Sequence, residues 1–304
     1  MSRAPEGDMQ ARPVPERDRG GLAIRELNVA AITAAVREMC MAANYDLPDD
    51  VYAALERGRE VEESPTGRAV FGQLVENADI ARADRVPICQ DTGFAVFFVN
   101  LGQDVHLVGG SFEEAVNEGV RRGYGDGFLR KSIAAEPGHA RKNTTDNTPC
   151  IVHTSIVPGD RVEISMMAKG GGAENMSSLN MLKPAQGWPG MVQAVLDTVS
   201  RAGSNPCPPI VLGIGIGGTI DMVTVLAKKA LLREIGSVHR DARIAGMEAE
   251  LLDKVNALGI GPQGLGGTQT CLAVFIEEMP CHIASMPLAV NVQCHAQRHK
   301  RVVL

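Results

Sequence analysis

The chain is 304 residues long, with 44% apolar residues, 4% aromatic residues and a formal net charge of −6 at pH 7. This length and apolar content exclude a largely disordered protein, and the interspersed charges exclude a basic surface for nucleic acid or an anionic membrane. No apolar run approaches the roughly 18 residues that a membrane-spanning helix needs, so we expect any partner to be a small molecule or another protein.

Residues 1–22 are polar, charged and rich in proline, and they lack the apolar segment of a signal peptide. We predict a flexible tail for residues 1–22 and a single domain for residues 23–304, because neither an internal repeat nor a low-complexity linker divides the rest of the chain. Without a targeting signal, the protein is expected in the cytoplasm.

Small and apolar residues recur at helical spacing through residues 24–46 and 51–77, with an interruption at Ser64 and Pro65. The N-terminal region is therefore predicted to be helical. Residues 93–99 form a short apolar run that begins at a glycine, and this run predicts a strand.

A turn signal at Pro158, Gly159 and Asp160 separates two further apolar segments, residues 150–156 and 161–167. This pattern predicts a β-hairpin. Helices are predicted for residues 188–202, 221–234 and 241–258, and buried strands for residues 210–216, 268–276 and 288–292. The mixture indicates an α/β fold, in which a helical N-terminal region precedes mixed sheet and helices around a site built from loops.

Seven cysteines, an odd number, are spread through the chain, and this distribution favours reduced thiols, some of them metal ligands, over a disulfide framework. Cys89 stands beside the amide of Gln90 and the carboxylate of Asp91, so a metal ligand and a proton carrier could share this loop. Taken alone, the segment fits equally well a buried cysteine before a turn that Asp91 caps.

Cys207 lies between prolines, whose restricted backbone would present the thiol from a rigid bend. The glycines that follow, Gly213, Gly215 and Gly218, match the GxGxxG pattern of a dinucleotide-binding loop. A nicotinamide-dependent oxidoreductase is therefore an alternative function, disfavoured by the late position of the motif in the chain. The same backbone could also donate N–H groups to a carboxylate or to a cluster sulfur.

Three consecutive glycines at residues 170–172 can gather backbone N–H groups around an anion such as a carboxylate, although a flexible loop is the alternative. Further along, Cys281, His282, Cys294 and nearby histidines suggest a zinc site. The chain contains no CxxC pair, however, and structural zinc sites usually take ligands from such close pairs. Well-separated thiols in loops instead suit a four-iron cluster, in which three thiolate ligands leave one iron open to act as a Lewis acid.

Several motifs occur in the order VPICQDTG, KNTTDNTP, KGGGAENMS, CPPIVLGIGIGG, GIGPQGLGG and HIASMPLAVNVQCHAQRH. With these motifs the chain resembles the alpha subunit of the class I fumarate hydratase family, to which alpha subunits of L-tartrate dehydratases are similar. The resemblance runs from about Ile24 to the C-terminus. It implies that residues 23–304 form an Fe–S hydro-lyase domain for the reversible hydration of fumarate to L-malate, with L-tartrate or a related hydroxy-dicarboxylate as the alternative substrate.

The resemblance further implies an oxygen-sensitive 4Fe-4S cluster with one open iron site. The ligands carried over by motif are Cys89, Cys207 and Cys294, and the cysteines outside these motifs are Cys40, Cys150, Cys271 and Cys281. The implied substrate-binding residues are Gln90, Asp91, Arg130, Gly171 and Gly172. Of these, Arg130 is expected to bind a carboxylate with both arms of its guanidinium, and Asp91 is expected to act with His282 in proton transfer.

A separate beta subunit is expected, because the chain ends ten residues after Cys294 whereas related single-chain fumarases continue into a second domain. That domain supplies further arginine, lysine and threonine groups, so both subunits are expected to be needed for activity on the small dicarboxylate, and the pair is expected to form a higher oligomer. A non-catalytic module, in which a cluster is structural and the chain is a scaffold for its partner, is a second alternative.

Overall fold

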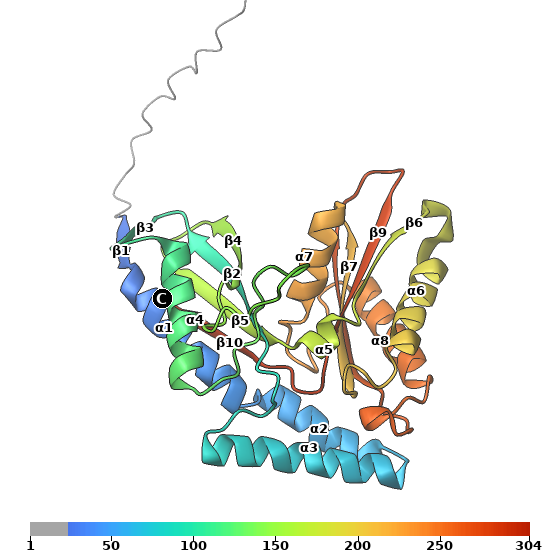
Figure 1. Cartoon of the computed structure of the whole chain (residues 1–304). Coiled ribbons are helices and arrows are strands. Elements are labelled where there is room, and N and C mark those ends of the chain that lie inside the picture. Colours follow the sequence, from blue (N-terminus) through green and yellow to red (C-terminus); the bar gives the residue numbers. More distant parts are fainter. Residues whose placement is uncertain (1–23) are drawn as a thin grey trace, which may run out of the picture.

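The computed structural model describes residues 24–304, and the tail predicted for residues 1–22 lies outside the described residues. Figure 1 shows two halves, each with a β-sheet, that stand apart at the top and meet above a base formed by α2 (Asp49–Val61) and α3 (Pro65–Asp84). The mixed sheets and helices confirm the predicted α/β class. Within residues 24–304, no helix combines the length and the apolar character needed to cross a membrane.

The first half contains a four-stranded sheet with the order β10-β5-β2-β4. Its strands are β2 (Phe94–Gly102), β4 (Ile151–Val157), β5 (Val162–Lys169) and β10 (His299–Val303). Helices α1 (Val29–Tyr45) and α4 (Phe112–Asp126) pack on each other and bury one face of this sheet. A short parallel pair, β1 (Arg25–Asn28) and β3 (Val105–Val108), lies beside them. Because β10 is the last strand, the C-terminal segment returns to the half in which the chain begins.

The predicted hairpin of residues 150–156 and 161–167 is wrong in its pairing. Both strands form, as β4 and β5, but β2 lies between them, parallel to β4 and antiparallel to β5. The physical reason is burial, because Phe97 of β2 packs into the core beneath α1 while the adjacent Val96 packs into the core on the opposite face. A strand with apolar side chains buried on both faces takes a central position, which leaves β4 at the edge.

The second half contains a four-stranded sheet with the order β6-β9-β7-β8. Its strands are β6 (Ser178–Leu182), β7 (Ile210–Gly217), β8 (Cys271–Met279) and β9 (Met286–Gln293). Helices α6 (Gly187–Ala202) and α8 (Ala242–Asn256) cover one face, and α7 (Ile220–Ala230) packs on the other (Figure 1). The strands and helices predicted between residues 188 and 292 all form, although α7 ends at Ala230 instead of residue 234.

Gly213 and Gly215 lie inside β7, where the strand pairs with β8 on one side and with β9 on the other. A Cβ atom at Gly213 would lie 2.1 Å from the Ala227 carbonyl oxygen, and one at Gly215 would lie 2.1 Å from that of Val223. Both glycines therefore permit the close packing of α7 against the sheet. Their backbone groups belong to the sheet and not to a phosphate-binding loop, so the main support for a nicotinamide-dependent oxidoreductase disappears.

A buried carboxylate joins the base of the molecule to the second half. Glu62, which follows α2, is 1% exposed, and it accepts the N–H groups of Ser64, Thr268 and Gln269 at distances of 2.8 to 3.0 Å. Burial alone would raise the pKa of Glu62, but these backbone N–H groups lower it. The contact fixes the loop before β8 against the turn between α2 and α3.

Replacing Glu62 with alanine is expected to lower the free energy of unfolding by on the order of 3 kcal/mol, because buried N–H groups lose their acceptor. Urea denaturation measures this change. The matched control is Glu63→Ala, which removes the exposed neighbouring carboxylate and should change the free energy of unfolding by less than about 0.5 kcal/mol. Equal stabilities of the two variants would contradict the proposed anchoring role.

Candidate active site

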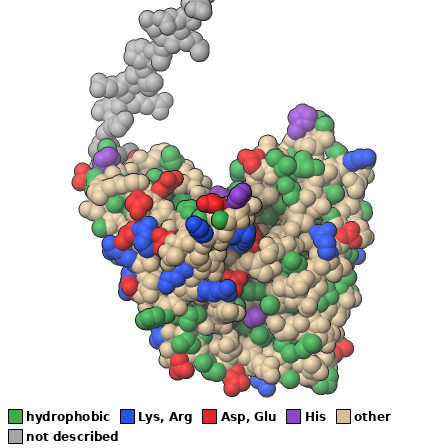
Figure 2. Space-filling model, in the orientation of Figure 1, with side chains coloured by type: hydrophobic (Ala, Val, Ile, Leu, Met, Phe, Trp, Pro, Cys, Tyr) green, Lys and Arg blue, Asp and Glu red, His purple; other side chains and the backbone are tan. Residues whose placement is uncertain are grey.

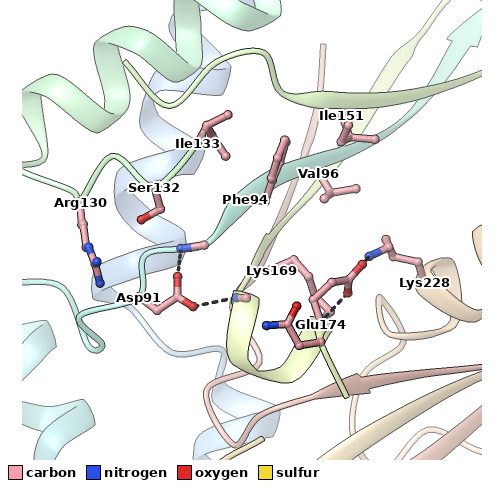
Figure 3. Close-up of a pocket in the computed structure, with 13 residues that line it drawn as sticks. Asp91, Phe94, Val96, Arg130, Ser132, Ile133, Ile151, Lys169, Glu174 and Lys228 are labelled. Carbon is pink, nitrogen blue, oxygen red and sulfur yellow. Dashed lines mark hydrogen bonds and ion pairs between the residues drawn. The ribbon is translucent and has the colours of Figure 1, made fainter. Parts of the chain in front are cut away.

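A cavity of about 540 Å³ lies where the two halves face each other. Figure 2 shows the surface hollowed between the halves, and Figure 3 shows the residues that line the cavity. Most of the lining comes from β2, β4, β5 and the segment after α4, and α7 of the second half adds Lys228. The polar side chains are Asp91, Arg130, Ser132, Lys169, Glu174, Asn175 and Lys228, and the apolar ones are Phe94, Val96, Ile133 and Ile151.

Asp91 is held by backbone N–H groups from two segments of the chain. Its Oδ1 accepts the N–H of Gly93 at 3.0 Å, and its Oδ2 accepts the N–H of Gly171, the first residue of the short helix α5 (Gly171–Glu174), at 2.7 Å. A Cβ atom at Gly170 would lie 3.2 Å from Asp91 Oδ2, so a glycine eases this approach. The structure thus joins Asp91 and Gly171, two residues predicted for the site, and orients the carboxylate (Figure 3).

The loop that carries Asp91 is fixed by a buried tyrosine of α4. The Tyr124 hydroxyl donates to the carbonyl oxygens of Thr92 and Gly93, at 2.8 and 3.0 Å. Burial raises the pKa of Tyr124, so its hydroxyl remains a donor. The Thr92 hydroxyl in turn donates to the Arg130 carbonyl oxygen at 2.7 Å. These contacts hold the backbone of Arg130 beside that of Asp91.

The segment KNTTDNTP forms hydrogen bonds with the backbone that follows Arg130. Asn147, which is fully buried, donates from Nδ2 to the Gly93 carbonyl oxygen at 3.3 Å and accepts the Ser132 N–H at 2.8 Å. Asn143 donates to the Lys131 carbonyl oxygen at 2.8 Å. The asparagines of this motif therefore position the backbone around Arg130.

Lys169, Glu174 and Lys228 form an ion-paired group along the cavity wall (Figure 3). Lys169 Nζ lies 3.0 Å from Glu174 Oε2 and donates to the Val292 carbonyl oxygen at 2.7 Å, while Lys228 pairs with Glu174 Oε1. Burial lowers the pKa of Lys169 to about 8. Burial alone would raise the pKa of Glu174, but the charges of Lys169 and Lys228 lower it to about 2. These three residues are not among the predicted site residues, and the local signal for Lys169 and Glu174 is their place on either side of the glycines in KGGGAE.

Acid is expected to weaken this ion-paired group. The folded-state pKa of Glu174, about 2, lies below the ordinary value of 4.5, so its ionised carboxylate contributes stability that is lost as the pH falls from 4.5 toward 2. The side chain is 42% exposed, and solvent screening limits the contribution to about 1–2 kcal/mol. Urea denaturation should therefore show a stability difference between Glu174→Gln and the unmodified protein at about pH 6 that narrows by about pH 3. A difference that does not vary with pH would contradict this expectation.

The three predicted cluster ligands lie on loops that approach one another. Burial raises the pKa of the Cys207 thiol, and the charges of Cys294 and Cys89 raise it further, so the three thiols are within electrostatic reach. The loop after β9 contacts the Cys207 loop directly, because His295 Nδ1 lies 3.0 Å from the Cys207 carbonyl oxygen. Cys207 is exposed and has a φ of 55°, a left-handed conformation uncommon for a residue with a side chain.

Glycine-rich segments pack against the Cys207 loop. Gln263 of the GIGPQGLGG motif donates its backbone N–H and its side-chain Nε2 to the Pro208 carbonyl oxygen, at 2.6 and 2.9 Å. A Cβ atom at Gly172 would lie 3.6 Å from the Asn205 carbonyl oxygen, so Gly172 faces the Cys207 loop and does not line the cavity. Helix α5 therefore lies between Asp91, which Gly171 contacts, and the thiol loop, which Gly172 contacts.

Among residues 24–304, no group of three or more His, Cys, Asp or Glu side chains is close enough to share one metal ion. A four-iron cluster does not require such a group, because each thiolate binds a different iron. The other thiols have different surroundings. Cys40 and Cys150 lie in the core of the first half, Cys271 lies in the core of the second half, and Cys281 is exposed.

His282 and Gln90 do not line the cavity. His282 lies in the exposed loop between β8 and β9, where its Nδ1 accepts the Ala284 N–H at 3.1 Å. Gln90 is exposed beside Cys89. The proton-transfer role of His282 and the substrate contact of Gln90 stay predictions.

The sequence is similar to known proteins over most of its length. The family model for fumarate hydratase (Fumerase) matches residues 33–303. A protein of Methanocaldococcus jannaschii, provisionally named L(+)-tartrate dehydratase subunit alpha, is 43% identical over 283 residues, which cover 90% of this chain and 98% of the relative. The L(+)-tartrate dehydratase alpha subunits of Escherichia coli (strain K12) and Shigella sonnei (strain Ss046) are each 32% identical over 254 residues, which cover 83% of this chain and 84% of the relative. The chain therefore belongs to the class I fumarate hydratase family of hydro-lyases.

Proposed function

We propose that the chain is the alpha subunit of a 4Fe-4S hydro-lyase that acts on a four-carbon dicarboxylic acid. The observation that carries this proposal is the cavity in which Asp91, Arg130 and Gly171 meet, beside loops that hold three thiols. L-tartrate is the better-supported substrate, because the relatives are named for L(+)-tartrate dehydratase. The reversible hydration of fumarate to L-malate is consistent with the family model.

The thiols of Cys89, Cys207 and Cys294 suit the proposed cluster. The Cys207 thiol lies within electrostatic reach of Cys89 and Cys294, and none of the three side chains is fully buried. Burial raises the pKa of Cys294, whereas the nearby charge of Arg298 lowers it, so a cationic group lies near the Cys294 sulfur. A cluster held by these cysteines would supply a Lewis-acidic iron for the hydroxyl and a carboxylate of the substrate.

The side chains of the chain itself account for binding and orientation. Arg130 binds a carboxylate, because its planar guanidinium can donate two parallel hydrogen bonds. The N–H groups of Gly93 and Gly171 keep the Asp91 carboxylate in place, where it can exchange a proton with the substrate. Apolar side chains from β2 and β4 line the same cavity and limit the water around the carbon chain.

The proposed partner is a beta subunit, because the relatives carry the name subunit alpha. We infer that it adds further carboxylate-binding and proton-transfer groups and that the αβ pairs form a higher oligomer. In the complete enzyme, His282 is proposed to act with Asp91 in proton transfer. The proposed location is the cytoplasm, where reducing conditions keep thiols available as ligands.

Anaerobic co-expression of the chain with its beta subunit tests the proposal. The purified αβ complex should be brown, should contain iron and sulfide, and should lose both colour and activity in air. Rates on L-tartrate and on L-malate then identify the substrate. A colourless anaerobic complex with full activity would overturn the cluster assignment, and bound zinc without iron, sulfide or activity would favour a non-catalytic scaffold.

A further inference from the structure

The group formed by Lys169, Glu174 and Lys228 carries a surplus positive charge. Its two ammonium groups share the single carboxylate of Glu174. In the described part of the chain, no other acidic oxygen lies within 4.0 Å of either ammonium nitrogen. Holding a charge away from water without a counter-ion is costly, so an anion that enters the cavity would be stabilised here.

Of the two lysines, Lys228 is the more exposed and has more donors left for a ligand. The Lys169 side chain is 2% exposed, and its ammonium both pairs with Glu174 and donates to the Val292 carbonyl oxygen. The Lys228 side chain is 16% exposed, and across residues 24–304 its ammonium donates only to Glu174. Because an ammonium group carries three N–H donors, Lys228 retains donors for a ligand in the cavity.

Lys228 and Arg130 lie at opposite ends of the group of lining residues, as Figure 3 shows. Asp91 lies between them, and Phe94 and Val96 form part of the wall along the same stretch. A four-carbon dicarboxylic acid has the matching pattern, with an anionic group at each end and carbon atoms between them.

We propose that Lys228 binds the second carboxylate of the substrate, opposite the carboxylate bound by Arg130. This inference rests on the proposed function, and it identifies Lys228 as a residue that selects dicarboxylates over monocarboxylates. A lysine suits this end of the cavity, because its compact ammonium can contact Glu174 and a substrate oxygen at the same time.

Binding of succinate and butyrate to the αβ complex tests the inference, because the two acids have equal carbon chains and differ in one carboxylate. The unmodified complex should bind succinate about tenfold or more tightly than butyrate. Lys228→Met should weaken succinate binding about ten- to hundredfold and change butyrate binding little, which removes the preference. Lys228→Arg should keep most of the preference for succinate over butyrate. Calorimetry on the anaerobic complex measures both affinities.

The matched control is Lys229→Met, because Lys229 is the next residue of α7 and lines a different cavity. This variant should bind succinate as the unmodified complex does. Tight succinate binding by Lys228→Met would overturn the inference, even if the complex turns over a hydroxy-dicarboxylate as proposed. Equal affinities of the unmodified complex for the two acids would overturn it without any variant.

The binding measurement does not depend on turnover, so the two proposals can fail separately. A preference for succinate that disappears in Lys228→Met supports the carboxylate site, whether or not the complex turns over a dicarboxylate. Absence of any hydration or dehydration of a dicarboxylate would refute the proposed reaction. Turnover of L-tartrate or L-malate with unchanged succinate binding in Lys228→Met would keep the reaction and refute the carboxylate site.

Discussion

Replacing Cys294 with serine is expected to abolish cluster assembly and hydro-lyase activity together. The cluster needs three thiolates, and a serine hydroxyl is neither ionised at neutral pH nor a soft ligand for iron. The iron and sulfide content of the anaerobic αβ complex of the variant should therefore be at least about tenfold lower than that of the unmodified complex. Iron and sulfide analysis with visible absorbance measures the loss, and rates on L-tartrate and L-malate measure the activity.

Cys281→Ser is the matched control for this substitution. Cys281 is exposed, and its Sγ donates to the Ser285 carbonyl oxygen at 3.3 Å, a contact that a serine hydroxyl can reproduce. This variant should keep its iron and its activity. Cys207→Ser should behave as Cys294→Ser does, and because Cys207 is exposed, such a result does not arise from a damaged core. Loss of iron in Cys281→Ser, with iron retained in Cys294→Ser, would show that the ligand assignment is wrong.

Asp91→Asn is expected to lower kcat by about a hundred- to ten-thousandfold with little change in iron content. An amide has nearly the shape of a carboxylate but does not take up a proton near neutral pH. Its NH2 group would also face one of the N–H groups of Gly93 and Gly171, which now donate to separate carboxylate oxygens. Steady-state rates on L-tartrate and L-malate, combined with iron analysis, measure the two effects.

Asp84→Asn is the control, because Asp84 is an exposed carboxylate at the end of α3. Its kcat and iron content should equal those of the unmodified complex. A normal kcat in Asp91→Asn would remove Asp91 from proton transfer. Loss of iron along with kcat would instead show that Asp91 mainly positions the neighbouring Cys89 loop.

Elements with strong local signals form where the sequence predicts them. The interruption at Ser64 and Pro65 is a helix start, because the Ser64 side chain accepts the Gly67 N–H and proline occupies the first turn of α3. Helix α4 is not predicted, because its buried apolar face is narrow and its sequence is rich in charge and glycine. A serine cap followed by two glutamates, at Ser111 to Glu114, is the signal that marks its start.

The last strand, β10, is not predicted from the sequence, for a different reason. β10 has the sequence HKRVV and lies at the edge of the sheet, where its only strand partner among residues 24–304 is β5. Charged residues are common in edge strands, so the sequence of such a strand shows little apolar alternation from which to predict it. Its position depends on the C-terminal segment crossing back to the first half, which a local pattern does not encode.

The sequence by itself determined the α/β class, the motifs of the site and the family resemblance, because each depends on which residues occur and in what order. Only the tertiary structure decided that β2 separates β4 from β5, that Asp91 meets Gly171 although the two are 80 positions apart, and that Lys228 lines the same cavity as Arg130. The physical reason is that these arrangements follow from which faces share a buried core. Periodicity indicates that a face is apolar, but it does not indicate which other face covers it.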